Sequence, residues 1–152
     1  MAFQFHLEKV LTHRRRLQDE AKRDFMLAQA NTVNALRDLE ALYVAIDVAR
    51  NRGHEVQVGI SDTRMAPTLQ NIDVFIGGQK IRIERQRVVI REFKAEEERL
   101  HDLLIEASKE KKTLEKLREK HLGAYRIEMA RREQLELDDL AIMRHGRGEG
   151  PV

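Results

Sequence analysis

Between Pro67 and Arg144 apolar residues recur on one seven-residue lattice, and this feature constrains the fold of the chain most. The lattice positions lie alternately three and four residues apart, which places their side chains along one stripe of a helix. Its apolar members are Leu69, Ile72, Ile76, Ile83, Ile90, Phe93, Leu100, Leu104, Ala107, Leu114, Tyr125, Leu135 and Ile142. A long, narrow apolar stripe between charged flanks predicts a coiled coil.

The same lattice also passes through polar residues, which become more frequent toward the C-terminal end. They include Gln79, Gln86, Glu97, Lys111, His121, Glu128 and Arg132. Two adjacent glycines, Gly77 and Gly78, interrupt the pattern near its start, at a cost of about 1 kcal/mol each relative to alanine. Two interpretations stay open: a tolerated bend within one helix, or a short helix over 67–76 followed by a longer one.

A second helix-forming segment precedes this one, because residues 5–51 contain neither glycine nor proline and consist largely of good helix formers. Most of its apolar residues are also three or four apart. They are Phe3, Leu7, Val10, Leu17, Ala21, Phe25, Ala28, Leu36, Leu39, Leu42, Tyr43 and Ile46. We therefore expect a helix over about 5–51.

Helix-breaking residues between the two segments predict a connector over 52–66, which contains Gly53, Gly59 and several small polar residues. Pro67 suits the first turn of the next helix, where its missing N–H costs nothing. The second helix is then expected over about 67–144. Residues 145–152 have the composition of a frayed tail. The whole chain, 1–152, is expected to form a single coiled-coil domain.

The predicted fold class is all-α, with two long helices in an antiparallel coiled coil and an overhanging, longer C-terminal helix. At 1.5 Å per residue the helices measure roughly 70 Å and 115 Å. If the connector folds the chain back, Ile46 should lie near Leu69 and Leu7 near residues 105–110. The stretch 116–144 of the second helix would then project beyond the first helix. Such a bare stretch either frays or binds another protein.

The composition argues against several classes of protein. Charged residues are 36% of the chain and aromatic residues 5%, which leaves too little bulky apolar material for a thick core. Lys plus Arg (28) nearly balances Asp plus Glu (26), unlike a dedicated nucleic-acid binder. Cysteine is absent, and no apolar run approaches the ~20 residues that cross a bilayer. We expect a cytoplasmic protein without a membrane anchor or signal peptide.

No catalytic constellation is recognisable in the sequence. The segment 77–80 lacks the spacing of a phosphate-binding loop. His6 and His13 are one heptad apart, roughly 10 Å along a helix, which is too far to share a metal ion. Within the acidic runs 96–98 and 138–139, adjacent carboxylates point to different sides of a helix and do not converge on one substrate. We therefore predict no enzymatic activity, no catalytic or metal-binding residues and no cofactor.

The strongest local charge bias is basic and lies between residues 80 and 94. Four of these residues recur at helical spacing and form a basic stripe: Lys80, Arg87, Arg91 and Lys94. Such a stripe can steer an acidic protein partner. Nucleic-acid binding is the alternative, but the chain lacks the stacking aromatics and recognisable folds of most nucleic-acid readers.

The residues near the two ends resemble a known family. They are Phe3, Phe5, Leu7, Val10, Leu11, Arg14 and Ala21, then the runs 115–120 and 132–134, Tyr125, Glu128, the run 137–139 and the run 141–144. This pattern is similar to FliJ, the small coiled-coil component of the bacterial flagellar type III export apparatus. The resemblance covers about residues 3–144.

The resemblance implies a stalk that inserts into the ring of the export ATPase and promotes its assembly and activity. It also implies contacts with the export gate protein in the membrane, recycling of export chaperones, and a peripheral location at the cytoplasmic face of the inner membrane. Partner contacts of the family cluster near the hairpin end. The matching positions are Leu39, Leu42, Tyr43, Ile46, Ile72, Phe75, Ile76 and Gln79.

One local expectation follows from sterics: three adjacent apolar side chains, 74–76, cannot all enter a two-stranded seam, so at least one should be exposed. Two rival functions stay open, namely a generic homodimeric scaffold and the stalk of a virulence type III secretion system. We predict a monomer in isolation, which distinguishes the stalk from the scaffold.

Overall fold

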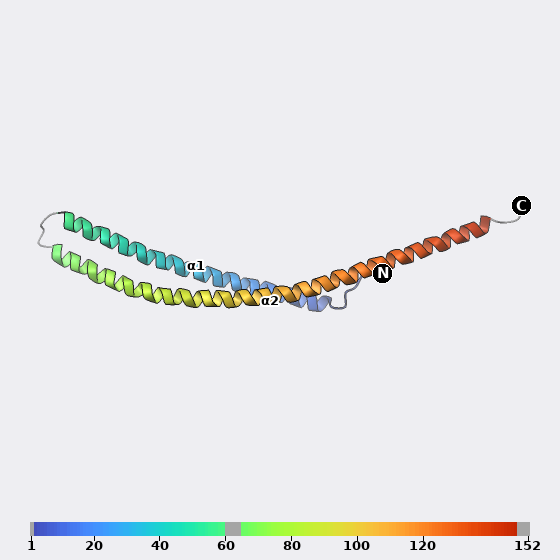
Figure 1. The fold of residues 1–152 in the computed structure, drawn as a ribbon, viewed down its shortest axis with the longest axis horizontal. Coiled ribbons are helices and arrows are strands. Elements are labelled where there is room, and N and C mark those ends of the chain that lie inside the picture. The colour runs from blue at the N-terminus through green and yellow to red at the C-terminus, as the bar shows by residue number, and fades with distance from the viewer. Residues whose placement is uncertain (1, 60–64, 149–152) are drawn as a thin grey trace. The chain divides into compact units, whose positions relative to one another are not determined.

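The computed structural model describes residues 2–59 and 65–148, and the side chains of 65–67 lie outside that description. It contains two α-helices, α1 (Glu8–Val58) and α2 (Met65–Gly148), and no strand in these ranges. Figure 1 shows the two helices side by side and running in opposite directions. The predicted all-α antiparallel hairpin is confirmed.

The helix boundaries differ from the predicted ones around the connector. Residues 52–58, expected in the connector, belong to α1, and α2 begins at Met65 with Pro67 in its first turn. Gly53 is buried, and a Cβ there would lie 3.8 Å from Ile72 and 3.9 Å from Leu69. Packing against α2 therefore overrides the low helix propensity of this glycine. Residues 60–64 of the predicted connector lie outside the described residues.

The second helix is continuous through Gly77 and Gly78, so the alternative with a separate short helix over 67–76 is not observed. A Cβ at either glycine would meet no atom within 4 Å, which places both on the solvent side. The glycines therefore weaken the helix without disturbing its seam. Of the predicted tail, 145–148 are helical and 149–152 lie outside the described residues.

The chain divides into two compact units, each containing part of both helices. The terminal unit comprises Met1–Asp19 and Glu106–Val152, and the hairpin unit comprises Glu20–Ile105. Each unit has its own buried residues.

The hairpin unit is held together by the predicted lattice. Its buried apolar residues are Ala28, Ala35, Ile46, Ala49, Ile83 and Ile90. Three of the four contributed by α1 are alanines, so the seam is narrow. Buried Thr32 shares this stripe, and its hydroxyl donates a 3.1 Å hydrogen bond to the Ala28 carbonyl one turn earlier.

The register of the hairpin unit is shifted from the predicted one. Ile46 lines a cavity together with Lys80 and Ile83, while Gly53 is the residue that faces Leu69. The predicted proximity of Ile46 to Leu69 is therefore wrong. The cause is the continuation of α1 to Val58, which moves the turn along the chain and every pairing with it.

The terminal unit is shifted in the same direction. Glu8 Oε2 accepts a 3.1 Å hydrogen bond from Arg118 Nε, so the neighbouring Leu7 does not lie near residues 105–110 as predicted. Arg14 forms an ion pair with Glu110, and Leu11 is fully buried. The ion pairs are largely solvent-exposed and contribute little, about 0–1 kcal/mol each. The burial of Leu11 dominates this unit.

Residues 2–7 precede α1 and extend the pairing along α2. Phe5 is buried and packs against His121 at 5.6 Å between ring centroids, and Phe3 packs against Tyr125 at 5.5 Å. Residues 130–148 are exposed throughout and form the overhang, the red end of α2 in Figure 1. The overhang is confirmed, but it begins later than the predicted Lys116 because the N-terminal aromatics cover that stretch.

We predict that Ile83→Ala lowers the free energy of unfolding by about 2 kcal/mol, because Ile83 is only 4% exposed and its removal leaves a cavity in the seam. Urea unfolding followed by circular dichroism measures the change. Ile81→Ala is the matched control, because Ile81 lies on the same helix and is 58% exposed. This substitution should lower the free energy of unfolding by less than about 0.5 kcal/mol. Equal losses for both variants would contradict the assigned seam.

Candidate partner-binding surfaces

The residues predicted to contact partners near the hairpin end separate into two groups. Six of them lie on the seam and are buried or half-buried: Leu39, Leu42, Ile46, Ile72, Ile76 and Gln79. Their first role is to hold the two helices together, and a contact with a partner at these six stays a prediction. The other two, Tyr43 and Phe75, are 41% and 44% exposed.

The expectation for residues 74–76 is confirmed, because Val74 is 71% exposed and Phe75 is also exposed, while Ile76 is half-buried on the seam. Exposed aromatic and branched apolar side chains are unfavourable in water and are typical of contact surfaces when they cluster. Phe75 belongs to such a cluster, whereas Val74 does not line it.

Phe75 is part of a cleft of about 620 Å³ near the turn between the helices, which we call the hairpin cleft. Its lining residues are Ala45, Val48, Ala49, Arg52, Thr68, Asn71, Ile72 and Phe75. Sequence reasoning identified Ile72 and Phe75 but missed Val48, which is 60% exposed. The pattern that could have revealed it is the presence of apolar residues off the heptad lattice of the first helix, at Val44 and Val48.

Two glutamines of α2 interrupt the apolar seam of the hairpin unit. Gln86 Nε2 donates a 2.9 Å hydrogen bond across the seam to the Ala35 carbonyl. Gln79 is 6% exposed, and its Oε1 accepts no hydrogen bond within the described part of the chain. A buried polar atom without a partner costs about 1–3 kcal/mol, and a polar residue at such a position fixes the helix register.

The basic stripe lies along α2 and beside α1. Arg87 is bonded within the unit: its Nη2 donates to the Tyr43 hydroxyl at 2.5 Å, and its Nη1 donates to Glu84 Oε1 at 2.7 Å. The hydrogen bond to Tyr43, followed by the charges of Tyr43 and Glu84, raises the pKa of Arg87 above its usual value. Arg87 thus orients Tyr43 on the surface.

The other three basic residues of the stripe make no ion pair within the described ranges, and they line the grooves between the helices. They are Lys80, Arg91 and Lys94. Their binding role stays a prediction.

The overhang is a third uncovered surface. Five large apolar side chains there are between 54% and 68% exposed: Leu135, Leu137, Leu140, Ile142 and Met143. Side-chain pairs one turn apart support the bare helix, with Arg132 Nε 3.1 Å from Glu128 Oε1 and Gln134 Nε2 3.0 Å from Asp138 Oδ1. These pairs stabilise the helix but leave its apolar residues without a partner.

The described side chains do not gather into groups suited to metal binding. No set of three or more His, Asp or Glu residues in the described ranges is placed to hold a metal ion. His6 stacks on His121 at 5.7 Å between ring centroids, with Phe5 beside both. Within the same ranges, neither helix contains a stretch long and apolar enough to cross a membrane.

Comparison with protein-family models decides the family, since residues 3–150 match the model described as flagellar FliJ protein. The chain belongs to the FliJ family. The resemblance noted from the residues at its two ends is thereby confirmed, and it extends over nearly the whole chain. The family places this coiled coil in flagellar protein export, a form of type III secretion.

Comparison with solved structures supports the fold of this FliJ-family chain. A protein from Chlamydia trachomatis described as a YscO homolog has a TM-score of 0.63 and 17% sequence identity. The alignment covers 99% of this chain and 100% of the other. At this identity the likeness concerns the fold alone. Comparison with curated proteins finds no match.

We predict that Gln79→Leu raises the free energy of unfolding by about 1 kcal/mol, because it removes a buried oxygen that has no hydrogen-bond donor. Thermal unfolding followed by circular dichroism measures the gain. The matched variant Gln86→Leu should raise the free energy of unfolding by a smaller amount, because it also removes the hydrogen bond to the Ala35 carbonyl. A loss of stability in Gln79→Leu would show that the polar atom is satisfied in solution.

Proposed function

We propose that this chain is the non-enzymatic stalk of a flagellar type III export apparatus, which binds the ring of the export ATPase and the export gate protein. The observation that carries the proposal is membership of the FliJ family over residues 3–150. The overhang supports it, because a bare helix with five exposed apolar side chains is suited to burial inside a protein ring. Export chaperones are further proposed partners.

A stalk without catalytic residues acts on an ATPase by presenting unequal surfaces. The overhang carries apolar residues such as Leu135 and Ile142 on one line and acidic residues such as Asp138 and Asp139 beside them. Equivalent subunits arranged around one helix cannot all make the same contacts with it. The subunits that bind best are stabilised in one nucleotide state, which shifts the population of states around the ring.

The hairpin cleft is proposed as the surface that contacts the gate protein. It is formed by the C-terminal part of α1 and the N-terminal part of α2, and its apolar lining includes Phe75. In this proposal the chain reaches the cytoplasmic face of the inner membrane through its protein partners.

The first test adds the purified chain to the cognate export ATPase and measures hydrolysis and ring formation together. We expect both to increase. The double variant Leu135→Glu/Ile142→Glu should abolish the increase while leaving the unfolding transition unchanged, because both side chains are exposed on the overhang. Ile81→Glu, on an exposed position of the hairpin unit, is the control and should stimulate normally. An unchanged ATPase with the unmodified chain would contradict the proposal.

The second test concerns the hairpin cleft. Phe75→Asp should weaken binding to the purified cytoplasmic part of the gate protein by about tenfold, because it places a charge in an apolar contact. Calorimetry measures the affinity, and circular dichroism should show intact helices. The adjacent variant Val74→Asp is the matched control, since Val74 is 71% exposed and lies outside the cleft. If both variants bind like the unmodified chain, the cleft is not the contact surface.

A further inference from the structure

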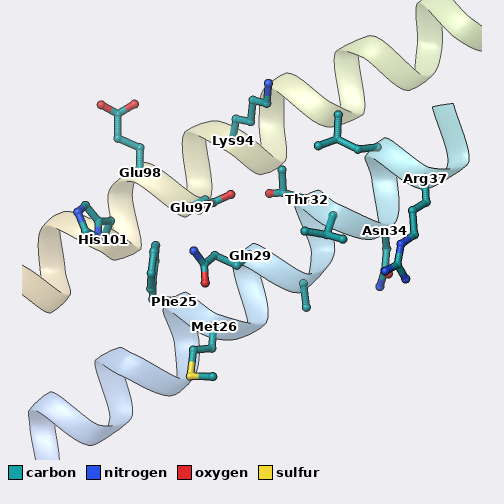
Figure 2. A pocket seen from close by; sticks show the side chains of 13 residues that line it. Phe25, Met26, Gln29, Thr32, Asn34, Arg37, Lys94, Glu97, Glu98 and His101 are labelled. Atoms are coloured by element: carbon teal, nitrogen blue, oxygen red, sulfur yellow. The ribbon is translucent and has the colours of Figure 1, made fainter. Parts of the chain in front are cut away.

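A second, larger groove lies on the hairpin unit, and none of its lining residues lines the hairpin cleft. We call it the central groove; it has a volume of about 1080 Å³ and is lined by α1 residues within 25–37 and α2 residues within 94–101. Figure 2 shows Phe25 and Thr32 on one helix facing His101 and Glu97 on the other. Neither of the surfaces proposed above includes these residues.

The groove is hollow because the seam residues beneath it are small. Ala28, Thr32 and Ala35 occupy successive seam positions of α1. Among the α2 residues that line the groove, the half-buried one is the polar Glu97. Phe25 packs against His101 across the groove, with 5.0 Å between the ring centroids. A two-stranded coil with such a thin seam does not fill the space between its helices.

The groove also has an apolar bank that the pairing of α1 and α2 does not use. Met26, Val33 and Leu36 line it and are 57%, 46% and 42% exposed. They lie seven and three residues apart on α1, along a line just beside the seam. A single helix with two adjacent apolar stripes is typical of a three-stranded assembly, in which each stripe packs against a different partner.

The opposite bank is basic where the groove continues toward the turn. Arg91 and Lys94 line the continuation beside Leu36 and Leu39, and Lys80 follows beside Tyr43 and Ile46. None of these three basic residues forms an ion pair within the described ranges, whereas Arg87 is already bonded to Glu84 and Tyr43. The free positive charges therefore complement negative charge on whatever covers the groove.

We propose that the central groove binds an acidic amphipathic helix of a partner protein, which lies along the groove as a third strand. Its apolar face covers Met26, Val33 and Leu36, and its carboxylates pair with Arg91, Lys94 and Lys80. This proposal does not rest on the export function, because it follows from the groove and its charges.

The character of the groove favours a helix over a nucleic acid. The α1 bank presents Met26, Val33 and Leu36, which suit the aliphatic side chains of a helix and offer no favourable contact to phosphates. Glu97 and Glu98 also line the groove, between Lys94 and His101, and would repel a polyanion that followed the whole groove. A helix satisfies both constraints by confining its acidic residues to the stretch beside the basic bank.

Binding of designed peptides to the full chain tests the proposal. The probe is a helical peptide of about three heptads with leucine at the apolar positions and glutamate beside them. A comparison peptide carries lysine in place of each glutamate. Fluorescence anisotropy should show that the glutamate peptide binds at least about tenfold more tightly than the lysine peptide, and less tightly as salt rises.

Variants of the chain locate the binding. Val33→Asp should weaken binding of the glutamate peptide about tenfold, whereas Val44→Asp, on the same helix and 53% exposed but outside the groove, should not. Arg91→Glu combined with Lys94→Glu should reverse the preference in favour of the lysine peptide. Arg82→Glu, a basic residue that lines none of these grooves, should leave the preference unchanged.

Three outcomes would overturn the proposal. Equal binding of the two peptides would remove the charge complementarity, and equal damage by Val33→Asp and Val44→Asp would place the binding elsewhere. A dimer of the unmodified chain that Val33→Asp dissociates, measured by light scattering, would assign the groove to a second copy of this chain.

Discussion

The packing of one narrow stripe of side chains from each helix is the interaction on which the rest of this structure depends. In the hairpin unit the stripe of α1 consists mostly of alanine and threonine, and that of α2 contributes Ile83 and Ile90. Such a seam buries few large side chains, so its stability comes from many small contributions spread along two long helices. Long helices are therefore a requirement of this packing: a short pair with the same seam would not fold.

A thin seam also decides where function can reside. Two paired helices enclose no interior pocket, so polar and apolar chemistry must be presented on the outside. Among the described residues, apolar surface is uncovered at the hairpin cleft, the central groove and the overhang. Each contains large exposed side chains, such as Phe75, Val33 and Ile142, whose exposure costs free energy until another protein covers them.

The fold was predictable from the sequence because the heptad lattice indicates which side chains face the other helix. The sequence predicted the register poorly, since a glycine in a connector and a glycine on a seam look alike in a sequence. Gly53 is helical because Leu69 and Ile72 pack around it, a contact that depends on the fold already formed. Similarly, the spacing of Phe3 and Phe5 fits the apolar pattern of the first helix, but both residues lie before α1 and pack against Tyr125 and His121 of α2.

The candidate surfaces were only partly predictable. Sequence resemblance locates a region and not a face, so the predicted partner contacts include buried seam residues such as Ile46 and Gln79, whose contact with a partner stays a prediction. Tyr43 and Phe75 are exposed although each is next to a half-buried seam residue, Leu42 and Ile76 respectively. The central groove escaped prediction because a hollow arises from the relative size of residues on two helices, which requires the register.

The central claim is that partners bind where the seam leaves apolar surface uncovered, and hydrogen exchange tests it most directly. In the isolated chain, amides of the paired helices should be protected and those of residues 130–148 should exchange fast. With the export ATPase present, 130–148 should become protected while the seam around Ile83 and Ile90 stays unchanged. Unchanged exchange in 130–148, with new protection confined to residues already covered, would contradict the account.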